Sequence, residues 1–224
     1  MTLLSGTPTD ATGYLSDTAA LAIGVEHRLE LTRRDLANPV SGLPNRAALL
    51  DRMREAVAQR GRLDAVLADC GLTPRAGSLA VVCLDLDHFQ GVGSALGLDG
   101  GDAALRAVAQ RIGVNAHDGD TLAQIGDDEF VVACSHLRDP EDAERFAESL
   151  VAGLRRPIVL ADGRSVTITA SAGVAVHSDS DTDTPETLLA QAAAALSTAK
   201  DLGRNRAMAF TPGAIDASDA FALR

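Results

Sequence analysis

The sequence predicts an α/β (α+β) sandwich in which helices cover a central, mainly antiparallel sheet. Residues 78–86 are almost continuously apolar, as expected of a strand that is buried on both faces. Two further strand patterns, 121–125 and 129–134, flank Gly126-Asp127-Asp128, a sequence typical of a hairpin turn. Helical patterns alternate with these strands, so the order is close to βαββαβ, as in ferredoxin-like and polymerase-palm folds.

The domain is expected to span 38–211, with an extension at each end. Residues 1–16 are polar and predict a poorly ordered lead-in. Residues 17–37 carry apolar positions at helical spacing and end before Pro39. We interpret this stretch as a stalk-like helix that pairs with a second copy; the alternative is packing against its own domain. Residues 212–224 are expected to be a tail or linker.

Periodicity and stop signals place the other elements of the domain. The expected helices span 46–59, 63–69, 102–114, 139–154 and 185–201. The expected strands after the first are 121–125, 129–134, 166–177 and 206–210. Pro140 suits the first turn of its helix, and Gly203 stops the last one. The glycine-rich stretch 90–101 is expected to be a connector.

Composition excludes several classes of protein. The 224 residues suit one domain with extensions, and the net charge of −11 argues against a general nucleic-acid or anionic-membrane binder. Three scattered cysteines form neither a disulfide framework nor a zinc site, and two of them, Cys83 and Cys134, sit in apolar runs typical of a core. No apolar run approaches the roughly 18–20 residues that span a bilayer, and no secretion signal is visible. We expect a cytoplasmic protein.

Acidic residues gather at two points that a sheet could bring together. Asp85 and Asp87 end the apolar strand, and Asp128 and Glu129 follow the hairpin glycine. If the two strands are neighbours, Asp85 and Asp128 converge, and paired carboxylates suit Mg²⁺. Such a site can activate a hydroxyl and neutralise a triphosphate. Either cluster taken alone is more commonly a solvated acidic turn or strand end.

A basic cluster follows the last helix. Lys200 and Arg204 are four residues apart, so they share a helical face if the helix extends that far. Together with Arg206 they could meet phosphate oxygens. The alternative is ordinary positive charge that complements the dipole at a helix C-terminus.

Six short motifs, taken in order, resemble the GGDEF family, the diguanylate cyclase domains that join two GTP molecules into cyclic di-GMP. The motifs are Ser41-Gly42-Leu43-Pro44-Asn45-Arg46, Asp85-Leu86-Asp87-His88-Phe89, Gly101-Asp102, Gly126-Asp127-Asp128-Glu129-Phe130, Ser171-Ala172-Gly173-Val174 and Ala199-Lys200 with Gly203-Arg204-Asn205. The resemblance runs from about 38 to 210.

The resemblance implies a Mg²⁺ or Mn²⁺ cofactor and a role for each matching residue. The implied metal contacts are the carboxylates of Asp85 and Asp128 and the backbone carbonyl of Leu86, and Asp128 and Glu129 are the implied catalytic residues. The implied nucleotide contacts are Asp102, which would read guanine, Lys200 and Arg204, which would hold the β and γ phosphates, and Gly93, Gly126 and Asp127. His117 and Asp120 stand where the family carries its Arg-x-x-Asp product-inhibition motif, so the arginine is missing.

The chain departs from the family pattern at several further positions. Asp127 replaces the second signature glycine, and Gly93 replaces an asparagine that reads guanine. The other departures are Asn38 for Asp, Gln90 for Lys, Ser94 for Asp, Leu98 for His and Gln124 for Arg. The Asp127 carboxylate would face the nucleotide phosphates, and two like charges about 4 Å apart repel by roughly 4 kcal/mol at an effective dielectric constant near 20. Such a repulsion lowers nucleotide affinity about a thousandfold. A site that relies on hydrogen bonds to a base also loses discrimination without them.

We therefore expect a degenerate GGDEF domain: a regulatory or interaction module in cyclic-dinucleotide signalling that binds GTP and Mg²⁺ without efficient turnover. The alternative is an active diguanylate cyclase that works as a homodimer, with relaxed base specificity and without product inhibition. A third hypothesis is a domain that only makes protein contacts. The expected partners are a second copy through the helix at 17–37 and a cyclic di-GMP phosphodiesterase or another signalling protein.

Overall fold

The structure is a computed structural model that describes residues 36–72, 79–135, 137, 140–177 and 184–211. The lead-in at 1–16, the tail at 212–224 and all but the last two residues of the helix expected over 17–37 lie outside these ranges. Those two residues, Leu36 and Ala37, are not helical, since Ala37 forms an isolated antiparallel bridge with Pro44.

The described residues form a mixed sandwich built on a five-stranded sheet. Its helices are α2 (Arg46–Asp69), α3 (Phe89–Leu96), α4 (Leu98–Gly113), α5 (Pro140–Leu154) and α6 (Pro185–Asp201). Its strands are β1 (Ala80–Leu86), β2 (Thr121–Gln124), β3 (Glu129–Cys134), β4 (Ile158–Val159), β5 (Ser165–Val166), β6 (Ala170–Val176) and β7 (Ala207–Ala209). The sheet order is β2-β3-β1-β6-β7, with all neighbours antiparallel except β6 and β7. The expected fold class is confirmed.

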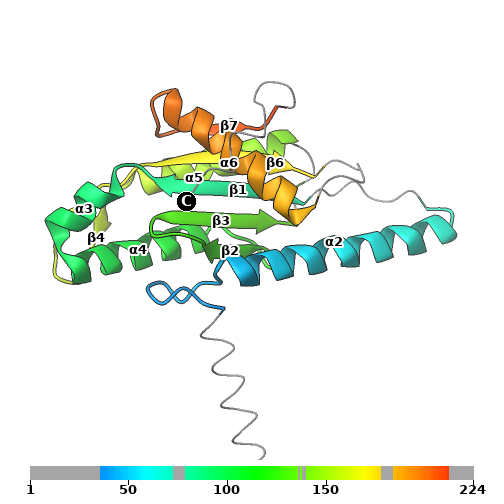
Figure 1. The fold of residues 1–224 in the computed structure, drawn as a ribbon, viewed down its shortest axis with the longest axis horizontal. Helices are drawn as coiled ribbons and strands as arrows, with labels where there is room; N and C mark the ends of the chain where they lie inside the picture. The colour runs from blue at the N-terminus through cyan, green and yellow to red at the C-terminus, as the bar shows by residue number, and fades with distance from the viewer. Residues whose placement is uncertain (1–35, 73–78, 136, 138–139, 178–183, 212–224) are drawn as a thin grey trace, which may run out of the picture.

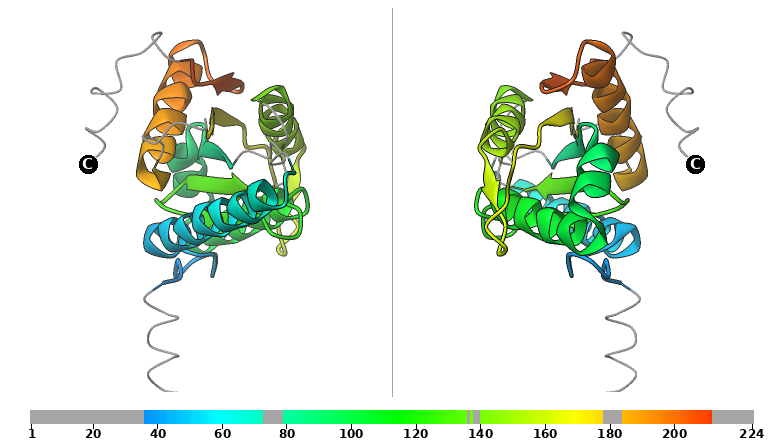
Figure 2. Two further views of the ribbon diagram at one scale, coloured as in Figure 1. Left: turned by 90° about the vertical axis from the view of Figure 1, so that its right-hand side faces the viewer. Right: turned by 90° about the vertical axis from the view of Figure 1, so that its left-hand side faces the viewer.

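Helices cover both faces of the sheet (Figures 1 and 2). Side chains of α4 and α5 pack on one face and those of α2 and α6 on the other, with Leu84 of β1 pointing to the first and Cys83 to the second. Cys83 and Cys134 are buried core residues as expected, and burial raises the pKa of the Cys83 thiol to about 12. None of the described helices combines the length and apolar character that crossing a bilayer requires.

Three elements differ from the sequence expectation. The helix α2 runs through 46–69 without a break, and Arg60 pairs with Asp64 one turn on, at 3.6 Å, across the expected interruption at Gly61. The stretch 90–101 is helical rather than a connector, since buried Phe89 anchors α3 at its start. The strand expected over 166–177 is split, because Val166 belongs to β5, which pairs only with β4.

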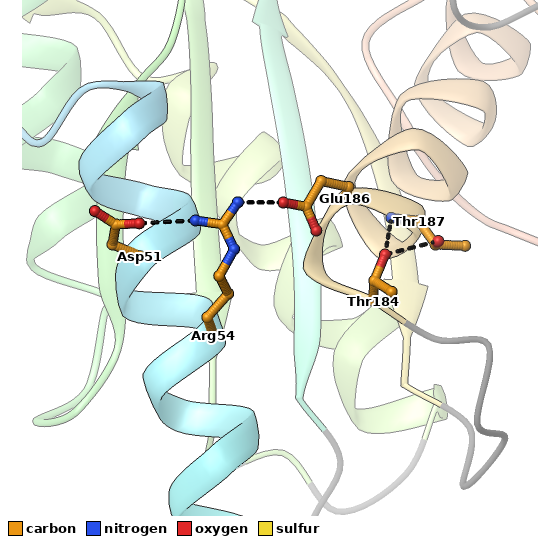
Figure 3. A network of polar contacts seen from close by, with 5 residues as sticks. All are labelled: Asp51, Arg54, Thr184, Glu186 and Thr187. Atoms are coloured by element: carbon orange, nitrogen blue, oxygen red, sulfur yellow. Dashed lines mark hydrogen bonds and ion pairs between the residues drawn. The ribbon is translucent and has the colours of Figure 1, made fainter.

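Polar contacts fix the start of α6 against α2 (Figure 3). Arg54 donates to Asp51 Oδ1 at 2.7 Å and to Glu186 Oε1 on α6. Thr184 caps α6 by accepting from the backbone N–H of Thr187 at 3.1 Å. The backbone N–H of Glu186 and, after it, the Arg54 guanidinium hold the pKa of the Glu186 carboxyl below its usual value. These contacts fix one end of the helix that carries Lys200 at the other.

The middle of α6 approaches the sheet at Gly173 of β6. A Cβ atom at this position would lie 2.0 Å from the Ala192 carbonyl oxygen and 2.2 Å from the Leu196 nitrogen. Both are backbone atoms of α6, so only glycine allows the helix to pack this closely on the strand. The short distance between α6 and the sheet therefore depends on glycine at position 173.

Candidate functional site

The predicted metal residues meet at the end of β1. Asp85 lies opposite Glu129 across the β1–β3 pair and opposite Ser171 across the β1–β6 pair. The backbone N–H of Leu86 donates to the Asp128 carbonyl oxygen at 3.2 Å. Because β1 and β3 are antiparallel neighbours, Asp85, Asp128 and Glu129 share one edge of the sheet, as the sequence led us to expect.

The carboxylates at this edge disfavour one another's charge. Partial burial raises the pKa of the Asp128 carboxyl, and the negative charges of Asp85 and Glu129 raise it further, while Lys200 acts in the opposite direction. A divalent cation would relieve this repulsion. Among the described residues, however, no three His, Cys, Asp or Glu side chains are arranged to hold a metal ion by themselves. This edge therefore fits Mg²⁺ that arrives with a phosphate ligand, since Mg²⁺ binds through one or two carboxylates plus substrate phosphates.

Lys200, the predicted phosphate contact, forms an ion pair with Asp85. Its Nζ lies 2.8 Å from Asp85 Oδ2, and the two side chains are 32% and 14% exposed. Residue spacing gave no signal for this pair, because the end of α6 and the end of β1 are 115 positions apart. A ligand that binds both Lys200 and Asp85 must therefore break this ion pair and replace it with its own contacts to the two side chains.

The hairpin turn depends on Gln124 and on one glycine. Gln124 is 1% exposed, and its Nε2 donates to the carbonyl oxygens of Gly126 at 3.1 Å and Asp127 at 3.0 Å, while its Oε1 has no hydrogen-bond partner among the described residues. Gly126 leaves room for the Glu129 side chain, because a Cβ there would lie 2.9 Å from Glu129 Oε2 and 3.2 Å from Glu129 Cβ. Neither Gly126 nor Asp127 has a positive φ, so the backbone of the turn accommodates aspartate at position 127. From the sequence, Gln124 was noted only as a replacement for a positively charged arginine of the family. In the structure its side-chain amide holds the turn through two hydrogen bonds.

A cavity of about 520 Å³ opens beside the hairpin. Its lining combines the loop at 37–45, Phe89, Asp102 and Leu105, and the turn residues 124–127. Asp102 of α4 and the exposed Asp127 therefore face one space, with apolar side chains around them. The volume is in the range of small-molecule sites. Gly93 lies close to this helix, since its Cα is 3.5 Å from where a Cβ on Gly101 would be.

Arg204 lies beyond the end of α6. The helix ends at Asp201, and Gly203, Arg204 and Asn205 have φ values of 104°, 62° and 50°. The condition for a shared helical face, a helix that extends to Arg204, is therefore not met. The left-handed residues turn the chain away, and the Arg204 N–H returns to the Ala199 carbonyl oxygen at 3.0 Å.

Asp87, the second acidic residue at the end of the apolar strand, bonds to the protein itself. It is 6% exposed and accepts hydrogen bonds from Ser171 Oγ at 2.7 Å and Thr169 Oγ1 at 2.8 Å. The backbone N–H of Asn205 donates to it as well, at 3.1 Å. With these bonds its oxygens are already engaged, so Asp85 and Asp128 are the better candidates for a cation.

His117 and Asp120, the counterparts of the inhibition motif, close the turn before β2. Asp120 Oδ2 accepts from the His117 backbone N–H at 2.8 Å, and Oδ1 accepts from the Ser135 N–H at 3.4 Å. The Asp120 side chain is fully covered. A structural role in this turn accounts for the carboxylate.

Replacing Asp128 by asparagine is expected to stabilise the ligand-free protein at neutral pH. Ionised Asp128 is disfavoured in the fold by burial and by Asp85 and Glu129, and removing such a charge commonly gains about 0.5–2 kcal/mol. Because the Asp128 pKa is raised, the gain should shrink as pH falls through it and the wild-type carboxyl takes up its proton. Thermal unfolding at pH 7 and pH 4 checks this, with the exposed Asp118→Asn as the charge-matched control. A lower melting temperature at pH 7 for Asp128→Asn than for this control would contradict it.

Comparison with known proteins identifies the family. Residues 36–206 match the family described as "Diguanylate cyclase, GGDEF domain". The bifunctional diguanylate cyclase/cyclic di-GMP phosphodiesterase MucR of Pseudomonas aeruginosa is 38% identical over 79% of this chain and 24% of the relative. Diguanylate cyclase TpbB of the same species is 33% identical over 74% of this chain and 35% of the relative. The chain thus spans about a quarter to a third of the length of these relatives.

Solved structures agree with this assignment. The isolated GGDEF domain of TpbB from P. aeruginosa superposes with a TM-score of 0.62 at 31% identity, covering 78% of this chain and 94% of that one. Diguanylate cyclase SiaD of P. aeruginosa, solved with its activator SiaC, gives a TM-score of 0.64 at 27% identity over 89% and 71% of the two chains. With the family matched over well more than half of its length, this chain belongs to the GGDEF domain family.

Proposed function

We propose that this chain is a regulatory GGDEF domain in cyclic di-GMP signalling, which binds Mg²⁺–GTP but turns it over poorly. The observation that carries the proposal is the grouping of Asp85, Asp128 and Lys200 at one sheet edge, with a 520 Å³ cavity opening beside the same hairpin. Binding groups of both signs are retained, while several groups that serve base reading and charge stabilisation in the family are replaced.

Each retained group has a task in the proposed complex. Mg²⁺, or Mn²⁺ in its place, would neutralise phosphate charge, and the carboxylates of Asp85 and Asp128 with the Leu86 carbonyl would hold it. Lys200 would leave Asp85 for the phosphates, and Arg204 would offer a second cation. Asp102 would accept hydrogen bonds from N–H groups of guanine in the cavity. Glu129 would add negative charge beside the metal.

Three replacements support poor turnover. Gly93 presents no side chain to a base, and Gln90 lacks the positive charge that would stabilise developing negative charge. Asp127 adds a carboxylate to the wall of the cavity. Each change weakens the reacting complex more than it disturbs the fold, since the sheet and hairpin remain intact.

The relatives support a role within a larger signalling protein. Besides MucR, proteins named cyclic di-GMP phosphodiesterase match this chain, among them NbdA of P. aeruginosa at 37% identity and PdeR of Escherichia coli at 31%. We propose that such a phosphodiesterase, in the same chain or as a partner, receives the nucleotide state of this domain. A second copy, paired through residues 17–37, is the other proposed partner.

Turnover as a diguanylate cyclase is the second candidate function. It is favoured by Asp85, Asp128 and Glu129 sharing one edge and by the matches to proteins named diguanylate cyclase, such as TpbB and DgcP of P. aeruginosa. In that case two copies would join two GTP molecules, with base preference relaxed at Gly93.

A product assay separates the two functions. The protein at high concentration is incubated with Mg²⁺ or Mn²⁺ and GTP, or GTP with ATP, and the nucleotides are separated by chromatography. We expect unchanged GTP, together with a rise in melting temperature on adding Mg²⁺ and GTP, because a ligand of the native state stabilises it. A cyclic dinucleotide would establish the cyclase instead. Unchanged GTP with no thermal shift would leave only the protein-contact hypothesis.

A further inference from the structure

We propose that Asp87 and Arg155 act together as positioning residues that hold Arg204 where it meets the terminal phosphate of a bound nucleoside triphosphate. The inference rests on the proposed nucleotide binding and goes further, because it assigns the selectivity for a triphosphate over a diphosphate to a contact outside the metal edge. The segment that Asp87 and Arg155 hold in place is the turn Gly203-Arg204-Asn205.

The turn is unfavourable on its own. Arg204 and Asn205 both have positive φ, at 62° and 50°, a region that L-residues other than glycine adopt at a cost. Two consecutive residues of this kind persist only where surrounding contacts enforce them. Arg204 itself is exposed, so packing of its own side chain does not supply that enforcement.

Asp87 enforces the turn from the sheet side. Its carboxylate is fixed by the hydroxyls of Ser171 and Thr169 and accepts the Asn205 N–H at 3.1 Å. A buried carboxylate that accepts a backbone N–H forms one of the stronger hydrogen bonds in proteins. The position of the turn relative to β1, and hence to Asp85, is set by this bond.

Arg155 enforces the turn from the other side. Its Nε donates to Asn205 Oδ1 at 2.8 Å and its Nη2 to the Asn205 carbonyl oxygen at 2.9 Å. Arg155 follows α5 directly, so the guanidinium links α5 to the turn after α6. Asn205 is thus held at its N–H, its side chain and its carbonyl, and Arg204 directly precedes it.

The consequence is a preset phosphate contact. Lys200 and Arg204 flank the end of α6, with Lys200 over Asp85 and Arg204 on the turn that Asp87 holds. A ligand whose inner phosphates engage the metal edge would reach Arg204 only with a further phosphate. Loosening the turn should then weaken GTP binding and leave GDP binding nearly unchanged.

The test is the ratio of GTP to GDP affinity, measured by calorimetry with Mg²⁺. Arg155→Ala removes an exposed side chain and should lower the ratio about tenfold, the typical worth of one charge-assisted contact to phosphate. Arg156→Ala removes the same charge one residue away, has no contact with Asn205 within the described chain, and should leave the ratio unchanged. Asp87→Asn should act like Arg155→Ala.

Hydrogen exchange of the ligand-free protein provides the second measurement. The amides of 204–206 should exchange faster in Arg155→Ala and Asp87→Asn than in the Arg156→Ala control. An unchanged affinity ratio in both variants would overturn the inference. A wild-type protein that binds neither nucleotide would overturn the proposed function, and the exchange data would then decide alone whether Asp87 and Arg155 hold the turn.

Discussion

Replacing Gly173 by alanine should be the most destabilising single-methyl change in the described part of this chain. The added Cβ would meet the backbone of α6 at Ala192 and Leu196, at 2.0 and 2.2 Å. Backbone atoms cannot swing aside as a side-chain end can, so the helix itself would have to lift. Overpacking typically costs about 1–3 kcal/mol and occasionally more, and we expect at least about 3 kcal/mol here.

Thermal unfolding by circular dichroism measures this effect. A loss of about 3 kcal/mol corresponds to roughly 6–12 °C for a domain of this size. The matched control is Gly153→Ala on α5, where no atom of the described residues lies within 4 Å of the added Cβ and φ is not positive. That change should be neutral or stabilising, because alanine is the better helix former by up to about 1 kcal/mol. A Gly173→Ala protein that melts within 1 °C or so of wild type would show that α6 yields easily.

The change at Gly173 should also reach the candidate site. α6 carries Lys200, whose Nζ contacts Asp85 at 2.8 Å. A helix lifted from β6 would lengthen this contact. Stability of the fold and geometry of the site are therefore linked through one glycine.

Sequence patterns predicted the parts of this structure that local chemistry decides. The hairpin strands and α6 follow from alternation, turn residues and caps, and β3 and α6 have the expected bounds. The meeting of Asp85 with Asp128 and Glu129 followed from placing two strands side by side. Each strand or helix was indicated by residues near one another in sequence, and the meeting of the carboxylates needed the added assumption that the two strands pair.

What escaped prediction depends on contacts between distant segments. No pattern around Lys200 indicates that it pairs with Asp85, and none around Asp87 indicates that it holds Asn205, 118 positions on. Gln124 looked like a lost cation, because only the folded turn shows its amide between two carbonyl groups. The sequence indicated that Gly203 stops the last helix, but it did not show the left-handed turn at Arg204 and Asn205 that follows.

The second large effect concerns Asp127, whose replacement by glycine should strengthen Mg²⁺–GTP binding. Asp127 lines the cavity with Asp102, so its carboxylate adds negative charge where a nucleotide would lie. At about 4 Å from a phosphate the repulsion is roughly 4 kcal/mol at an effective dielectric constant of 20, but about 1 kcal/mol in bulk water. Asp127 is exposed, which favours the lower part of this range. The expected gain is therefore between about fivefold and a thousandfold.

Two comparison variants separate charge from backbone freedom. Asp127→Asn removes the charge and keeps the bulk, and it should give most of the gain, because the turn places no positive φ at this position. Asp118→Asn, an exposed carboxylate in the turn before β2, changes the net charge of −11 equally and should give almost none. Titration calorimetry at two salt concentrations adds a further check. A gain that arises from repulsion should shrink as salt rises, since the screening length falls from about 10 Å at 0.1 M to about 3 Å at 1 M.

The outcome of the Asp127 replacements bears directly on why the domain would turn GTP over poorly. If affinity rises with both replacements and turnover stays absent, charge repulsion limits binding, while the loss of base reading at Gly93 and of positive charge at Gln90 limits the chemistry. If affinity rises and cyclic dinucleotide appears, one carboxylate alone holds the enzyme back, and the edge formed by Asp85, Asp128 and Glu129 is competent. If neither replacement changes affinity, the carboxylate of Asp127 points away from the bound phosphates, and repulsion is not the reason for weak binding.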